Sequence, residues 1–253
     1  MKKTIFKAFI FLILTCVAGY LIWDNTKPDL KENTTETSLE EGTKYFNKIK
    51  LSRYFSLGDI KRATYFYNNT DNRLTKLDVN YLISALDLDL EANEGLEKGN
   101  WVSRVSEDNI NEKFNELYGD NAAYNHLDSI NYNCYIYNYN ESDGYYYDTN
   151  IKDINCSNSV YSLNEVVFSY KKLTDHLEID TYTYVFNYEE DYLSIYNYDK
   201  LDKVIAKIPV IDEFDGNIDE SEIIKYKDKL HKYRYVFNKG IDGKYYLAKI
   251  IKL

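Results

Sequence analysis

This chain of 253 residues has only three histidines and two prolines. The histidines, His126, His176 and His231, are dispersed, and none stands at a metal-binding spacing such as His-x-x-x-His. A Gly-x-Ser-x-Gly elbow and a phosphate-binding glycine loop are also absent. The chain therefore lacks the motifs of several common enzyme classes, which favours a protein that is not an enzyme and holds no cofactor or metal.

Positive charge is also in short supply. The formal net charge is −10, and the first 23 residues hold three lysines and no acid, so the rest carries 28 basic and 41 acidic side chains. A surface with this excess of negative charge repels phosphate backbones, which argues against a nucleic-acid partner. Tyrosine, in contrast, is abundant, with 28 residues, and the AT-rich codons of a low-GC genome explain much of that bias.

An apolar segment follows the basic start of the chain. Residues 5–23 form an apolar run that only Lys7 interrupts. A helix of about 19 residues spans roughly 28 Å, close to the hydrocarbon thickness of a bilayer. Lysines precede the run and acids follow it, which favours a cytoplasmic N-terminus and an extracellular C-terminal domain. We expect a single-pass anchor in the cell membrane, made by residues 1–23.

Two other interpretations of this segment stay open. A signal peptide has a small-x-small cleavage site at Cys16-Val17-Ala18, and a lipoprotein would be modified at Cys16. Cleavage after Ala18 would leave the apolar residues 20–23 at the new terminus, which favours an uncleaved anchor. All three interpretations export residues 24–253.

The exported part is predicted to be a linker followed by one domain. Residues 24–37 are polar and lack aromatic side chains, which is typical of a flexible linker. Residues 38–253 predict an extracytoplasmic α+β domain, with helices at about 38–120 and a sheet at about 127–253.

Three helices are expected in the first part of this domain. The first begins at Ser38, the second follows Thr75, and the third has Ser106 as its N-cap. Gly119 is expected to end the third helix. The predicted core positions of the three helices are, in order, Tyr45, Phe46 and Ile49; Leu77, Tyr81, Leu82, Ala85 and Leu86; and Ile110, Phe114 and Leu117.

From about residue 127 the apolar pattern repeats every second residue, which is typical of strands. The predicted elements are strands at 133–140 and 145–150 around a turn at 141–144, strands at 160–173 and 177–188, a strand at 192–198, a helix at 219–229, and strands at 232–238 and 244–252. The predicted fold class is α+β: an N-terminal transmembrane helix, then helices packed on a mostly antiparallel β-sheet. Cystatin-like and NTF2-like domains are analogies for it.

Cys134 and Cys156 form an even pair in the exported part, where disulfides persist. A bridge between them would pin the intervening segment to the sheet, and the chain-entropy model gives such a loop a stabilisation on the order of 3 kcal/mol. Two separate buried thiols are the alternative. We expect Cys134–Cys156 as a candidate disulfide.

Residues 211–222 overlay the calcium-binding loop of an EF-hand in part. Gly216 falls at the sharp turn and Glu222 at the bidentate position, but Ile211 occupies the first ligand position. An acidic turn before a helix, with carboxylates that suit the helix dipole, is the simpler interpretation. We therefore expect no metal there.

Tyrosines alternate along residues 135–139, so one face of that strand is predicted to display them. Exposed tyrosines stack on sugars or anchor a protein partner. The alternative is that tyrosine simply suits the half-buried surface of a sheet.

The layout of the chain resembles the uncharacterised single-span or lipid-anchored exported proteins of low-GC Gram-positive bacteria. The shared features are the start Lys2-Lys3 with its apolar span, the segments 105–107 and 118–120, and the ending around 233–237 and 242–247. The resemblance implies no activity and carries over no functional residue.

These observations predict a membrane-anchored extracytoplasmic protein that serves the cell envelope as a non-enzymatic binding or accessory module. Its partners would be the membrane, through residues 5–23, and a protein or glycan of the envelope. The alternative is a cell-wall-active hydrolase, because a carboxylate pair for glycoside cleavage is compatible with so many acids.

Overall fold

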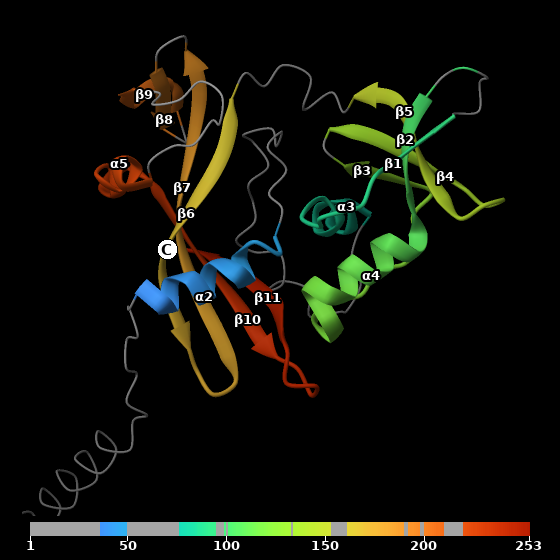
Figure 1. The fold of residues 1–253 in the computed structure, drawn as a ribbon, viewed down its shortest axis with the longest axis horizontal. Helices are drawn as coiled ribbons and strands as arrows, with labels where there is room; N and C mark the ends of the chain where they lie inside the picture. Colours follow the sequence, from blue (N-terminus) through green and yellow to red (C-terminus); the bar gives the residue numbers. More distant parts are fainter. Residues whose placement is uncertain are drawn as a thin grey trace, which may run out of the picture. The chain divides into compact units, whose positions relative to one another are not determined.

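The structure is a computed structural model that describes residues 36–49, 76–94, 99, 101–132, 134–152, 161–189, 192–197, 200–209 and 220–253. These residues belong to one compact unit, Thr34–Leu253, and its fold is α+β with antiparallel strand pairs (Figure 1). Within these ranges no helix has the length and apolar character that crossing a membrane requires. The apolar residues 5–23 lie outside them, so the anchor stays a prediction.

Four helices and eleven strands make up the described residues. The helices are α2 Glu36–Phe46, α3 Lys76–Ser84, α4 Glu107–Tyr118 and α5 Glu220–Ile224, with the 3₁₀ turns η2 Gly119–Asn121 and η4 Lys227–Lys229. The strands are β1 Glu91–Glu94, β2 Trp101–Ser106, β3 Ser129–Tyr132, β4 Tyr135–Asn140, β5 Tyr145–Lys152, β6 Ser162–Lys172, β7 His176–Glu189, β8 Tyr192–Asn197, β9 Lys200–Pro209, β10 His231–Lys239 and β11 Tyr245–Lys252.

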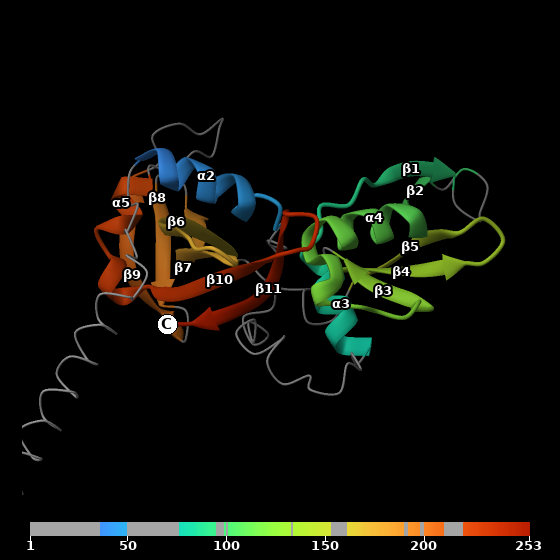
Figure 2. The ribbon, with the colours of Figure 1, turned by 90° about the horizontal axis from the view of Figure 1, so that it is seen from below.

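The first sheet has five strands in the order β1-β2-β5-β4-β3. The registers place Val105 opposite Tyr146, and Tyr146 opposite Tyr139, so these three side chains share one face. Helices α3 and α4 pack on this sheet, and Val105 and Tyr146 are buried in the core beneath them (Figure 2).

Helix α4 has the ends that its sequence predicts. The Ser106 hydroxyl accepts a hydrogen bond from the Asn109 amide at 3.1 Å, and Gly119 follows the last turn with a φ of 51°. Ile110 and Phe114 are buried on the face toward the sheet. The N-cap, the C-terminal glycine and the apolar face are thus all confirmed.

The second sheet is arranged around β7, a strand of 14 residues. Strand β6 pairs along one edge of β7. The other edge is shared, because β10 pairs with His176–Thr183 and β8 with Val185–Glu189. Strands β11 and β9 extend these two branches. The sheet therefore forks at the middle of β7.

Both faces of β7 contribute to a hydrophobic core, which explains its apolar composition. Ile179 faces the core cluster that also holds Phe46 of α2, whereas Tyr182 and Tyr184 face a second cluster with Ile223 of α5. Helix α2 lies on the first of these faces, packed against β6 (Figure 2).

The first two predicted helices exist, with differences at their ends and faces. Helix α2 begins at Glu36, so Ser38 lies within the helix and is not its N-cap. Thr75, the expected cap of α3, is outside the described residues. Leu77 was expected in the core but is 64% exposed, because the face of α3 that packs inward carries Val79 and Ile83.

The predicted hairpins are confirmed, including the turn at 141–144, where Gly144 has a φ of 75°. The structure has two sheets where one was expected, and four strands were not predicted: β1, β2, β3 and β9. Two of these, β1 and β2, lie within the part expected to be helical. The helix expected at 219–229 forms as α5 and the short turn η4.

Candidate functional site

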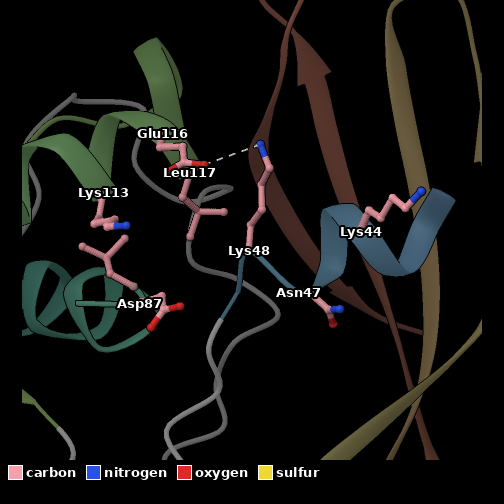
Figure 3. Close-up of a pocket in the computed structure, with 8 residues that line it drawn as sticks. Lys44, Asn47, Lys48, Asp87, Lys113, Glu116 and Leu117 are labelled. Atoms are coloured by element: carbon pink, nitrogen blue, oxygen red, sulfur yellow. Dashed lines mark ion pairs between the residues drawn. The ribbon is translucent and has the colours of Figure 1, made fainter. Parts of the chain in front are cut away.

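An open pocket of about 250 Å³ lies where the C-terminal turns of α2 and α4 meet the residues that follow α3 (Figure 3). We call it the lysine pocket. Its lining residues are Lys44, Asn47, Lys48, Leu86, Asp87, Lys113, Glu116 and Leu117. The lining combines ammonium groups, carboxylates, one amide and two leucines.

Helix geometry brings the α4 side of the pocket together. Lys113, Glu116 and Leu117 stand at i, i+3 and i+4 and therefore share one face of the last two turns. Leu117 is only 3% exposed and Leu86 only 1%, so both are anchored in the core. These leucines form an apolar base beneath the charged groups.

The α2 side is held by backbone hydrogen bonds beyond the end of the helix. The Asn47 amide donates to the Thr43 carbonyl at 2.8 Å, and the Lys48 amide donates to the Tyr45 carbonyl at 3.2 Å. Ile49, which follows, is buried at 5% exposure. The backbone at Asn47 and Lys48 is thus fixed, while their exposed side chains reach the pocket.

Lys48 and Lys113 direct their amines toward the space between α2 and α4, while the amine of Lys44 points away from it (Figure 3). Ion pairs of the three lysines are long: Lys48–Glu116 at 4.0 Å, Lys113–Asp89 at 3.6 Å and Lys44–Glu40 at 3.4 Å. By comparison, Lys207 lies 2.7 Å from Glu189. Long pairs at a solvated surface stabilise a fold little, so an incoming anion can replace the carboxylate as the partner.

A second polar cluster joins the first turn of α4 to the first sheet. Glu107 accepts a hydrogen bond from the Tyr139 hydroxyl at 2.8 Å, and its other oxygen lies 3.0 Å from Nδ1 of His126. The Tyr146 hydroxyl donates to the Leu127 carbonyl at 2.8 Å and lies 3.3 Å from the same ring nitrogen. We call these residues the His126 cluster.

The bond from Tyr139, and next the one to His126, holds the pKa of Glu107 below its ordinary value. Burial raises the pKa of Tyr146 well above the usual range. The cluster therefore holds an ionised glutamate between a tyrosine and a histidine. Its contacts hold α4 against β4 and β5. This structural role explains the His126 cluster, and no chemical reaction is needed to explain it.

The other two histidines are far from this cluster in the fold. His176 starts β7, where its ring lies between Asp175 at 2.7 Å and Glu178 at 3.6 Å. His231 starts β10, which runs antiparallel to β7, so His231 and His176 lie at opposite ends of that pairing. Among the described residues there is no group of three or more His, Cys, Asp or Glu that could hold a metal.

The remaining predicted sites fall partly or wholly outside the described residues. Cys134 lies in the turn between β3 and β4 with a φ of 68° and is disulfide-bonded. Cys156 is outside the described residues, so its identity as the partner stays a prediction. In the calcium-loop segment only Glu220–Glu222 are described, and Glu222 pairs with Lys225. The absence of calcium there also stays a prediction.

Ten of the described tyrosines are buried and most of the others are half-buried, including Tyr135 and Tyr139 on the strand that was expected to display them. Those that are buried are Tyr118, Tyr132, Tyr137, Tyr146, Tyr170, Tyr182, Tyr184, Tyr233, Tyr235 and Tyr245. Tyr188 and Tyr192 are exposed by 50% and 43%, but Tyr192 pairs with Glu189, so these two side chains point to opposite faces of the sheet. Tyrosine is thus buried or half-buried at most positions of the described part.

Sequence reasoning did not find the lysine pocket. The spacing of Lys113, Glu116 and Leu117 on a predicted helix was a signal for one of its sides. No pattern along the chain indicated that α2 and α4 meet.

Comparisons with known proteins found no match for this chain. Neither a protein-family model, nor a curated protein, nor a solved structure matches it. The resemblance to exported Gram-positive proteins accordingly stays a prediction.

Proposed function

We propose that this chain is a non-enzymatic binding module of the cell envelope that holds a small anionic ligand in the lysine pocket. In this proposal residues 5–23 anchor the protein in the membrane and the domain lies outside the cytoplasm. The ligand-binding residues are Lys48 and Lys113. The envelope module expected from the sequence is kept, and the contact moves from surface tyrosines to this pocket.

The observation that carries the proposal is the pair of amines that face one pocket, one from the turn after α2 and one from α4. Lys48 and Lys113 are 65 positions apart in a chain of net charge −10, and their carboxylate partners among the described residues lie at 4.0 Å and 3.6 Å. Ammonium groups donate charge-assisted hydrogen bonds to carboxylates and phosphates. Two loosely paired donors at one open pocket favour an oxyanion as the ligand.

Calorimetric titration of the full chain, kept in a mild detergent, with methyl phosphate tests the proposal. We expect binding that weakens as salt is added, because added ions screen exposed charges. Lys48→Ala and Lys113→Ala should each weaken binding about tenfold, since each removes one charge-assisted hydrogen bond.

Lys76→Ala is the matched control, because Lys76 on α3 has an exposed ion pair of similar length, 3.7 Å to Asp128, outside the pocket. It should leave the affinity unchanged. Equal affinities of the two pocket variants and the parent chain would contradict the proposal. So would the absence of binding at millimolar methyl phosphate.

A further inference from the structure

On the premise that the lysine pocket is an anion site, we infer that its ligand also carries hydroxyl groups: a small polyol with one acid group, such as a glycerol phosphate. The inference rests on the proposed function and names the ligand class of the same pocket. It comes from the acceptor groups that stand beside the lysines.

Oxygen acceptors share the lining with the ammonium groups. Glu116 and Asp87 each bring a carboxylate to the pocket, and Asn47 brings an amide. Ionised carboxylates only accept hydrogen bonds. The carboxylates of Glu116 and Asp87 therefore repel the charge of a bare oxyanion, but they accept hydrogen bonds from hydroxyl groups. A ligand with both an acid and hydroxyl groups uses both kinds of lining residue.

Glu116 retains capacity to accept a hydrogen bond from a ligand. Its ion-pair partner among the described residues, the amine of Lys48, lies at 4.0 Å, which is beyond hydrogen-bond distance. The side chain of Glu116 is also 56% exposed, so a ligand can reach it. Glu116 therefore stands beside the anion-binding amine as an acceptor for a neighbouring hydroxyl.

The size of the pocket favours a small carbon skeleton over a bare ion. The pocket volume of about 250 Å³ lies just below the range of about 300–1,000 Å³ that is usual for drug-sized ligands. Leu86 and Leu117 form its apolar base. A short polyol chain suits a space of this size, with its oxygens toward the polar lining.

Two phosphate esters that differ only in hydroxyl groups test the inference. Glycerol 3-phosphate and methyl phosphate are titrated into the full chain and into the Glu116→Ala variant, with glycerol as the neutral control. We expect the parent chain to bind glycerol 3-phosphate about tenfold more tightly than methyl phosphate, as expected for added hydrogen bonds to a charged group. Glycerol alone should not bind measurably.

The variant should change the two affinities in opposite directions. Glu116→Ala removes an acceptor for hydroxyl groups, so glycerol 3-phosphate should bind more weakly, and it removes a repulsive charge, so methyl phosphate should bind more tightly. Equal affinity of the parent chain for both esters would overturn the inference and leave the proposed function standing. If neither ester binds, both fall.

Discussion

At the scale of single residues, Gly119 shows most clearly how one position constrains the fold. A Cβ atom at Gly119 would lie 2.6 Å from the ring of Tyr246, and the backbone has a φ of 51°. The Tyr246 ring is itself held, because its hydroxyl donates to Asp242 at 2.7 Å. Glycine is thus required both by the dihedral angle and by the close approach of a fixed ring.

Gly119→Ala is expected to lower the free energy of unfolding by about 2–4 kcal/mol, the combined cost of backbone strain and overpacking. Gly243→Ala is the control, since Gly243 also has a positive φ, 81°, but nothing lies within 4 Å of its added Cβ. We expect it to cost about 1 kcal/mol. Urea denaturation of both variants measures the difference, and equal losses would show that the clash with Tyr246 is relieved.

At the scale of elements, local signals predicted what depends on neighbours in sequence. Ser106 and Gly119 fixed the ends of α4, and the turn at 141–144 fixed one hairpin. Strand β1 was missed because its four residues, Glu-Ala-Asn-Glu, carry no apolar alternation, and it forms by pairing with β2. The lysine pocket was missed for a related reason, because it needs α2 and α4 to meet and no local pattern encodes that.

The hydrogen bond between Glu107 of α4 and Tyr139 of β4 is expected to make the stability of the fold depend on pH. The folded pKa of Glu107 is lowered, first by the Tyr139 hydroxyl, so its stabilising contribution is complete above the unfolded pKa and is lost as the pH falls through the folded pKa. Tyr139→Phe removes the main cause of the shift. It should flatten the dependence of the unfolding free energy on pH below about pH 5.

Denaturant titrations between about pH 3 and 7 measure this dependence. Tyr135→Phe, on the same strand, is the control and should keep the slope of the parent chain, because the hydroxyl that bonds Glu107 is that of Tyr139. A Tyr139→Phe slope identical to that of the parent would show that Glu107 is not stabilised through this hydroxyl.

At the scale of the whole molecule, the expected anchor would hold the lysine pocket at the outer side of the membrane. We expect the full chain to sediment with membranes and a chain that starts at residue 24 to stay in the supernatant, because only residues 5–23 have the apolar length to span a bilayer. Fractionation followed by N-terminal sequencing measures both. A mature terminus at Gly19 would contradict the uncleaved anchor.

The fork in the second sheet has a consequence for the order in which this chain folds. Among the described residues, half of one edge of β7 pairs with residues 231–238, which follow β8, β9 and α5 along the chain. Until those residues emerge, that half presents unpaired backbone groups, which invite pairing with another chain. For the proposed exported protein, secretion in an extended form, with sheet closure delayed until β10 has crossed, would avoid that hazard. The order of synthesis thus places the completion of this sheet after β10.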